Sequence, residues 1–435
     1  MDEFELIERF LVPLTESGRD QRKRDFPSDK LFDQLRTRED CALLHFDQDV
    51  VALSSDTLVA GVHFDESISI ETIASRAIAT AVSDLAAANA KPDACLLNLV
   101  LPKAFAGDER SLLALHKGLD KACARYGLSI VGGDTTKGEN QVSSSLPSVI
   151  SVTCLGRVEG SENQLRSLGR GLAQADACLY CAPAGESLGL ASLRLAEGFS
   201  ELADIDQILI EEAFACPALP FELAKLAAAS GARAAMDVSD GLLADVQKFA
   251  KCSGLGVELF LDQVPVSRTY YRLAARLGLS QEEAAIRALS FGDDYALLFA
   301  LPADCLSPDL HRRLLQSKAK LIGRFFAAPT QDQDKRSLVK DERFMITCSN
   351  SDQVVVSLGD EADVPVGEFN NSDGKKVSKE PGERGFKTPR KECSKMGNSS
   401  PGSLEDGQAL WHTRPSSVVK LEAWLAENRA GYIHF

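Results

Sequence analysis

Short apolar segments with the composition of strands alternate with helical segments along most of this chain, and this alternation restricts the fold more than any other feature. In the first part of the chain, strands are expected at 41–62 (two strands around a turn at 47–49), 96–101 (a buried strand), 128–132, 147–156 and 177–182. Helices are expected at 4–12, 71–90 and 109–126. The pattern predicts an α+β protein in which helices cover sheets.

The alternation continues in the second part of the chain. Helices are expected near 187–198, 205–215, 220–230 and 242–252, and strands at 234–238, 257–261 and 295–301. A chain of 435 residues has room for two or three domains. We therefore expect two α/β domains, the first spanning 1–160 and the second combining 161–330 with 409–435.

The segment 331–408 differs in composition from the rest of the chain. It is rich in charged residues, Gly, Ser and Pro and poor in large apolar residues, which predicts a disordered insertion. Within it, the valines at 354–356 could form a short edge strand. Order is expected to return at 416–435, where a serine precedes an amphipathic helix and an aromatic terminus.

Charge and cysteine content limit the function. The formal net charge of −15 disfavours binding to nucleic acid or to an anionic membrane. The eleven cysteines are an odd number and are scattered, as in proteins of a reducing compartment. The acidic start lacks the features of a signal peptide, and no apolar run is long enough to cross a bilayer. A cytoplasmic location is expected.

Carboxylates stand in loops or at element ends in widely separated segments. The set comprises Glu39, Asp40, Asp56, Asp84, Asp134, Asp237, Asp240, Asp293 and Asp294. Asp56 or Asp134 alone could be a turn residue that bonds its own backbone, and Asp240 could cap the following helix. Asp84 lies in a nearly apolar helix, where an unpartnered carboxylate costs several kcal/mol. Because carboxylate and hydroxyl oxygens are hard ligands, the set predicts Mg²⁺ ions that would offset phosphate charge.

Several common nucleotide-binding motifs are missing from the sequence. It contains no G-x-x-x-x-G-K-[ST], no G-x-G-x-x-G between a strand and a helix, and no kinase H-R-D with D-F-G. Ser54 and Ser239 have no histidine nearby in the sequence to act as a base, so no covalent nucleophile is expected. Cys178 and Cys181 lie in a strand-like run, which disfavours a zinc or redox role. His63 could contact substrate or be structural.

Five motifs together resemble the thiamine-monophosphate kinase family. They are SSDTLVAGVHF (54–64), AVSDLAAANA (81–90), VGGDTT (131–136), DVSDGLLAD (237–245) and GYIHF (431–435). The resemblance implies two α/β domains of the aminoimidazole ribonucleotide synthetase-like architecture, with an N-terminal domain that dimerises through a β-sheet. It also implies that ATP and several Mg²⁺ ions lie between the domains, and that ATP phosphorylates thiamine monophosphate to thiamine diphosphate.

The resemblance also implies roles for individual residues. The positions that match metal ligands are Asp40, Ser54, Ser55, Asp56, Asp84, Asp134, Asp237 and Asp240. The positions that match ATP contacts are Gly133, Asp134, Arg170 and Ser239. His63 falls near the thiamine phosphate, and Asp293 and Tyr432 fall where the family binds thiamine. Direct in-line transfer is expected, with the protein mainly positioning two anionic reactants.

Two loops depart from the family pattern. The glycine-rich turn before 41–44 is replaced by Arg-Thr-Arg-Glu-Asp at 36–40, and G-G-E-D-Y-E becomes Phe-Gly-Asp-Asp-Tyr-Ala at 291–296. These changes leave two alternatives open: another ATP-using enzyme of the same superfamily, or a nucleotide-binding dimer without catalysis. Retention of the acidic set argues against the second, because clustered carboxylates repel one another without a metal.

Overall fold

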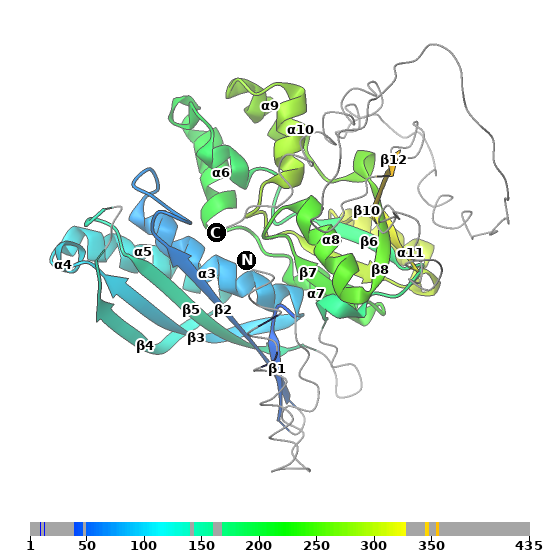
Figure 1. The fold of residues 1–435 in the computed structure, drawn as a ribbon, viewed down its shortest axis with the longest axis horizontal. Helices are drawn as coiled ribbons and strands as arrows, with labels where there is room; N and C mark the ends of the chain where they lie inside the picture. The colour runs from blue at the N-terminus through cyan, green and yellow to red at the C-terminus, as the bar shows by residue number, and fades with distance from the viewer. Residues whose placement is uncertain are drawn as a thin grey trace.

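The computed structural model describes residues 39–46, 49–139, 143–159 and 168–327, the isolated residues 9 and 13, and the backbone of 344–347 and 354–355. Figure 1 shows two α/β units side by side, one on a five-stranded sheet and the other on a seven-stranded sheet. The predicted α+β class is confirmed. No described helix is long and apolar enough to span a membrane, and the cytoplasmic location stays a prediction.

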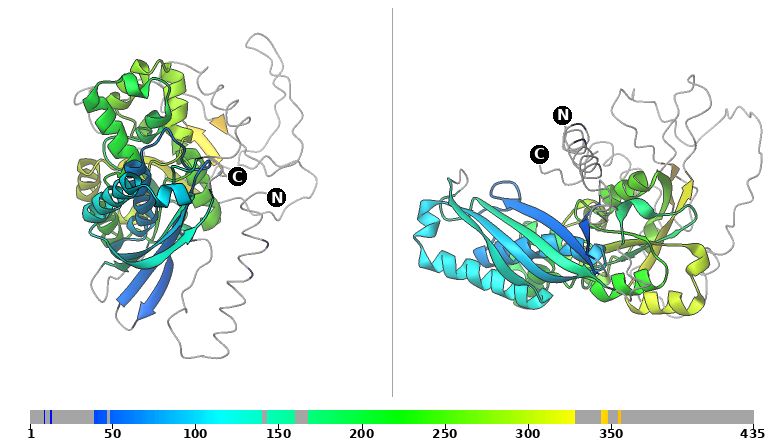
Figure 2. Two further views of the ribbon diagram at one scale, coloured as in Figure 1. Left: turned by 90° about the vertical axis from the view of Figure 1, so that its left-hand side faces the viewer. Right: turned by 90° about the horizontal axis from the view of Figure 1, so that it is seen from below.

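The first sheet has the strand order β1-β2-β5-β3-β4 and is antiparallel except for the pair β3–β4. Its strands are β1 (Ala42–Phe46), β2 (Asp49–Val59), β3 (Ala90–Leu101), β4 (Ser129–Lys137) and β5 (Val149–Val158). The helices of this unit are α3 (Ile70–Ala87), α4 (Lys103–Ala106) and α5 (Glu109–Tyr126). Helix α3 packs on one face of the sheet and α5 packs on α3 (Figure 2).

One face of this sheet and its β4 edge are open to solvent. Every residue of β4 is exposed, and the exposed fraction reaches 64% at Val131 and 43% at Leu96 on β3. The strand predicted at 96–101 is confirmed as part of β3, but most of it is not buried, because among the described residues no helix covers this face. An exposed apolar strand at a sheet edge is a ready surface for pairing with another chain.

The second sheet has the order β12-β11-β8-β10-β6-β9-β7. Its strands are β6 (Cys178–Ala182), β7 (Ala234–Asp237), β8 (Leu255–Phe260), β9 (Leu297–Leu301), β10 (Lys320–Ala327), β11 (Phe344–Thr347) and β12 (Val354–Val355). Its α-helices are α6 (Asp204–Ala215), α7 (Phe221–Ala229), α8 (Leu242–Ser253), α9 (Arg268–Arg276), α10 (Gln281–Ser290) and α11 (Pro308–Gln316). Helices α8 and α10 pack on one face of the sheet, and α7 and α11 on the other.

Some local predictions were right and others were wrong. Cys178 and Cys181 are buried on opposite faces of β6, as expected for strand residues. The helix predicted at 187–198 is only a 3-10 turn, Ala191–Leu195, and β10 and α9 to α11 were not predicted. The valines at 354–355 form the edge strand β12. Strand β11, Phe344–Thr347, also lies within the predicted disordered insertion and pairs with β8, so the prediction is wrong for this part of the segment. The helix at 4–12 apart from residue 9, the remainder of the insertion and the segment 409–435 with Tyr432 lie outside the described residues.

Candidate functional site

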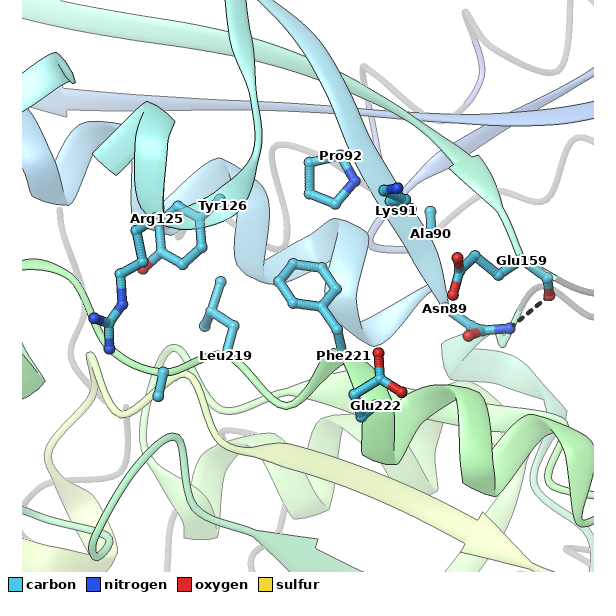
Figure 3. Close-up of a pocket in the computed structure, with 11 residues that line it drawn as sticks. Asn89, Ala90, Lys91, Pro92, Arg125, Tyr126, Glu159, Leu219, Phe221 and Glu222 are labelled. Carbon is cyan, nitrogen blue, oxygen red and sulfur yellow. Dashed lines mark hydrogen bonds between the residues drawn. The ribbon is translucent and has the colours of Figure 1, made fainter. Parts of the chain in front are cut away.

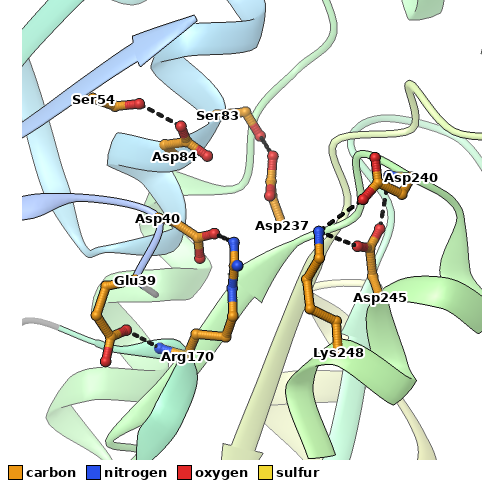
Figure 4. Close-up of polar contacts among 10 residues, drawn as sticks. All are labelled: Glu39, Asp40, Ser54, Ser83, Asp84, Arg170, Asp237, Asp240, Asp245 and Lys248. Carbon is orange, nitrogen blue, oxygen red and sulfur yellow. Dashed lines mark hydrogen bonds and ion pairs between the residues drawn. The ribbon is translucent and has the colours of Figure 1, made fainter. Parts of the chain in front are cut away.

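Three of the predicted ligands converge where the two units meet. Asp84 lies on the last turn of α3, Asp237 ends β7, and Asp40 precedes β1. Helix α3 packs along β7, so residues 153 positions apart in the sequence become neighbours. One carboxylate oxygen from each of the three lies within 4.8 Å of the others (Figure 4). We call Asp40, Asp84 and Asp237 the acidic triad.

Hydroxyl groups orient two members of the triad. Ser54 Oγ donates a hydrogen bond to Asp84, and Ser83 Oγ donates to Asp237 at 2.6 Å. Burial raises the pKa of Asp84, and the negative charge of Asp237 raises it further. Burial also raises the pKa of Asp237. Three close carboxylates with oriented oxygens fit a hard divalent cation such as Mg²⁺, which would relieve their mutual repulsion.

Arg170 provides a positive charge at the edge of the triad. Its guanidinium forms an ion pair with Asp40, and its backbone N–H donates to the carboxylate of Glu39. Both acids therefore anchor the 3-10 turn Arg170–Leu172 against the start of β1. The structure thus brings the predicted ATP contact Arg170 to the predicted metal ligand Asp40.

A second acidic group lies at the start of α8. Lys248 Nζ lies 2.7 Å from Asp240 Oδ2 and 3.5 Å from Asp245 Oδ1, and the backbone N–H of Asp240 donates to Asp245 Oδ2 at 2.9 Å (Figure 4). Asp240 does not cap the helix, because Gly241 occupies the N-cap position and Asp240 turns toward Lys248. Sequence reasoning missed both Asp245 and Lys248.

The remaining predicted ligands are divided between the two faces of the first sheet. Asp56 lies close enough to Asp84 for its charge to raise that pKa, and Asp56 Oδ1 accepts from the backbone N–H of Thr57. Ser55 alternates with Ser54, so it turns to the other face and its Oγ lies 2.9 Å from that of Thr153. Ser55 is therefore separated from the triad.

Asp134 and Gly133 lie on β4, which β3 and β5 separate from β2. Neighbouring strands are about 4.8 Å apart, so β4 lies roughly 14 Å from β2 in the same chain. Asp134 is consequently not brought to the triad within one chain. Gly133 has φ 146°, and a Cβ there would lie 1.8 Å from the carbonyl oxygen of Leu97, so the close approach of β3 requires glycine.

A buried arginine joins two of the three predicted substrate residues. Arg76, 3% exposed on α3, donates to the carbonyl oxygen of His63 at 2.7 Å and pairs with Asp293 at 2.6 Å. Asp293 also accepts a hydrogen bond from the hydroxyl of Tyr295 at 2.8 Å. His63 Nδ1 in turn accepts from the backbone N–H of Val59. Arg76 was missed, although it is the one basic residue of this largely buried helix.

The loop that carries Asp293 is strained and lies against Ser239. Asp293 and Tyr295 have φ values of 65° and 47°, which cost about 1–3 kcal/mol each in residues other than glycine. The backbone N–H of Asp293 donates to the carbonyl oxygen of Ser239 at 3.0 Å. A Cβ on Gly292 would lie 2.1 Å from that same oxygen. The 237–240 and 291–296 segments are thereby held together.

One separate pocket contains none of the predicted site residues. Its volume is about 470 Å³, and it lies between the start of β3, the end of α5 and the loop before α7 (Figure 3). Tyr126 and Phe221 line it, with Arg125, Glu159 and Glu222 among the charged residues. The pocket is therefore separate from the site formed by the acidic triad.

Comparison with known proteins places this fold and site in a class. Residues 38–158 match the family described as AIR synthase related protein, N-terminal domain. The AaThiL protein solved with AMPPCP and TMP has a TM-score of 0.55 at 26% identity, over 71% of this chain and 89% of that one. Thiamine-monophosphate kinase from Stenotrophomonas maltophilia has a TM-score of 0.54 at 28% identity, over 71% and 92%. The chain is thus an α/β protein of the AIR synthase related class.

Similar sequences identify the family within this class. Thiamine-monophosphate kinase from Haemophilus influenzae is 30% identical over 307 residues, which cover 70% of this chain and 83% of that protein. The Escherichia coli K12 protein of the same name is 32% identical, over 63% and 78%. The chain belongs to the thiamine-monophosphate kinase family and is an ATP-dependent kinase.

The buried carboxylates make the metal-free protein sensitive to pH. Burial raises the pKa of Asp245 to about 7, and burial also raises the pKa of Asp84 and Asp237. A carboxyl group with a raised pKa in the folded state stabilises the fold below its unfolded pKa of about 4 and loses this contribution as pH rises through the folded pKa. In EDTA, the free energy of unfolding should therefore fall as pH rises from about 4 to 7.

Melting temperatures in EDTA at pH 5, 6, 7 and 8 would measure this decline. Added Mg²⁺ should raise the melting temperature more at pH 8 than at pH 5, because the ion binds the ionised carboxylates. A melting temperature in EDTA that stays level or rises from pH 5 to 8 would contradict the assignment of raised pKa values.

Proposed function

We propose that the protein transfers the terminal phosphate of ATP to thiamine monophosphate and forms ADP and thiamine diphosphate. Family membership supports this reaction, and the observation that carries it is the convergence of Asp40, Asp84 and Asp237 where the two α/β units meet. The proposal assigns ATP and Mg²⁺ to this junction. The domain limits 1–160 and 161–330 with 409–435 belong to the same proposal.

The acidic triad and Asp56 would hold Mg²⁺, with Ser54 and Ser83 orienting the carboxylates. When bound, Mg²⁺ ions neutralise phosphate charge and stabilise the charge that develops during transfer. Arg170 and Ser239 lie beside the triad and the Asp237 loop, where they would contact ATP. Arg170 has a permanent positive charge, so its guanidinium could leave Asp40 for a phosphate of ATP when ATP binds and remain in an ion pair.

The substrate would bind beside Arg76, about two turns before Ser83 and Asp84 on α3. Arg76 holds both the His63 backbone and the Asp293 carboxylate, so these two of the three predicted substrate residues are fixed to one helix. His63 would face the phosphate of thiamine monophosphate, and Asp293, with Tyr432, would contact the thiamine part. Rigid placement of the acceptor phosphate raises the rate because it removes orientational freedom before transfer.

Direct in-line transfer agrees with the hydrogen bonds at this site. Ser54 Oγ donates to Asp84, and His63 Nδ1 accepts a backbone hydrogen bond from Val59, so these two side chains do not form a serine–histidine pair. A covalent phosphoenzyme would need an activated nucleophile of that kind. The main contribution of this chain is therefore to position the two phosphates and to hold Mg²⁺.

The proposal includes a homodimer formed through the first sheet. The open face, the exposed β4 edge and the distance of Asp134 from the triad support it. If the two copies pack through their open sheet faces, Gly133 and Asp134 of one copy would complete the site of the other, because pairing edge to edge through β4 would place them still farther from β2. Sedimentation equilibrium tests this arrangement, and a monomer at micromolar concentration with full activity would contradict it.

Purified protein given ATP, Mg²⁺ and thiamine monophosphate should form thiamine diphosphate and ADP in equal amounts. Free thiamine should be a poor acceptor because it lacks the phosphate that the site would position. Chromatographic separation of thiamine esters, with ADP measured in parallel, provides the readout. No phosphorylated protein should accumulate during turnover.

Two other results would replace this proposal. Turnover of a different acceptor, such as an aminoimidazole precursor or selenide, would assign a related activity of the superfamily. ATP binding without transfer to any of these acceptors would indicate a nucleotide-binding dimer without catalysis, consistent with the engagement of Asp293 by Arg76.

A further inference from the structure

Lys248 occupies a position between acidic groups where a metal ion could otherwise lie. Its ammonium group is 2.7 Å from Asp240 Oδ2 and 3.5 Å from Asp245 Oδ1. The Lys248 side chain is 18% exposed and Asp245 is fully buried, so this contact is largely shielded from solvent. Figure 4 shows the ammonium on the side of Asp240 and Asp245 that faces Asp237.

Asp245 has no alternative partner for one of its oxygens. Oδ2 accepts from the backbone N–H of Asp240, whereas Oδ1 has no hydrogen-bond partner among the described residues and only the Lys248 ammonium nearby. Burial favours the protonated acid, and a nearby cation is what stabilises the charged form of a carboxyl group in this situation. Lys248 supplies this cation and at the same time neutralises Asp240.

The two acidic groups therefore differ in how their charge is balanced. In the triad, Asp84 and Asp237 accept hydrogen bonds from serine hydroxyl groups, and Arg170 pairs with Asp40. At Asp240 and Asp245, a lysine side chain already bridges the two carboxylates. A divalent ion on Asp240 would need to approach to about 2.1 Å and would be repelled by the ammonium group.

We propose that Lys248 supplies the positive charge at Asp240 and Asp245 that a divalent cation would otherwise supply, so that Asp240 is not a metal ligand in this chain. The inference rests on the proposed Mg²⁺ site at the triad. It means that the triad and the Asp240–Asp245 group together bind one divalent ion fewer than they would if Asp240 were a ligand. It departs from the sequence-based expectation that Asp240 binds Mg²⁺.

The number of Mn²⁺ ions bound per chain, measured by electron paramagnetic resonance without nucleotide, tests the proposal. Lys248→Met should bind one more Mn²⁺ than the parent, and the double variant Lys248→Met/Asp240→Asn should return to the parental number. Lys248→Arg should match the parent because it keeps the charge. Lys225→Gln is the matched control, since Lys225 forms an exposed ion pair with Glu159.

Asp240→Asn decides the question even if Lys248→Met does not fold. It should bind as many Mn²⁺ ions as the parent, with affinities unchanged within twofold. If Asp240→Asn binds one Mn²⁺ ion fewer than the parent, or binds Mn²⁺ tenfold more weakly, the proposal is overturned. It is also overturned if a folded Lys248→Met binds the same number of Mn²⁺ ions as the parent. Failure of the proposed function is distinguishable, because Mn²⁺ binding is read without turnover and Asp84→Asn reports separately on the triad.

Discussion

Replacing Asp84 with asparagine is expected to lower Mg²⁺-dependent formation of thiamine diphosphate by roughly 10²-fold or more, while the fold remains intact. Asp84 contributes one of the three converging carboxylates, and asparagine keeps the size and can still accept the Ser54 hydrogen bond. The lost charge, rather than a change in packing, should account for the effect. Steady-state assays across a range of Mg²⁺ concentrations measure it.

The same substitution should stabilise the metal-free protein. The pKa of Asp84 is raised by burial and by Asp237, so removing its charge relieves an unfavourable interaction that is strongest at high pH. We expect a gain of about 1 kcal/mol or more in the free energy of unfolding at pH 8 in EDTA. Opposite effects on activity and stability, together with a changed dependence on Mg²⁺ concentration, would support a metal site.

Asp93→Asn is the matched control for Asp84→Asn. Asp93 lies on β3 in an exposed ion pair with Arg157, 2.7 Å long, away from the triad. Loss of an exposed pair changes stability by about 0–1 kcal/mol and should leave activity unaltered. Activity of Asp84→Asn near that of Asp93→Asn would disprove the shared metal site.

Replacing Arg76 with methionine should cause the largest loss of stability. Arg76 and Asp293 form an ion pair whose side chains are 4% and 9% exposed, and Arg76 also stacks on the ring of Phe214 at 4.6 Å. Methionine would leave Asp293 buried without a countercharge, which costs about 3–5 kcal/mol. Urea unfolding with an unchanged m-value would measure this loss.

The double variant Arg76→Met/Asp293→Asn separates charge from packing. If the uncompensated carboxylate causes most of the loss, the double variant should recover at least half of it. The control Arg157→Met breaks an exposed pair and should cost less than about 1 kcal/mol. A loss in Arg76→Met as small as in this control would show that the buried pair does not hold the two units together.

Arg76→Met should also raise the KM for thiamine monophosphate more than that for ATP. The arginine fixes the His63 backbone and the Asp293 carboxylate, whereas the predicted ATP contact Arg170 is tied to Asp40 elsewhere. Equal changes in both KM values would point to a general loss of structure. This comparison therefore tests the division of the site into a substrate side and an ATP side.

Local pattern in the sequence determined most of the elements near the site. Helix α3 and strands β2, β5, β6 and β9 follow from residue periodicity and composition, which depend on near neighbours in the chain. The sequence also determined that Asp84 needs a partner, because it lies in an apolar helix. The 3-10 turn Ala191–Leu195 was mistaken for a helix because its apolar residues have helical spacing, but Gly189 and Gly198, with φ values of 83° and 79°, interrupt a helix on either side.

Only the tertiary structure decided which charged groups meet. Arg76 and Asp293 are 217 residues apart, and Lys248 and Asp240 meet because the lysine turns back toward the start of its helix. The structure also separated Asp134 from the triad, since strand order places β5 and β3 between β2 and β4. Strand order and the packing of α3 against β7 result from burial of apolar surface over the whole chain, so no local pattern of residues determines them.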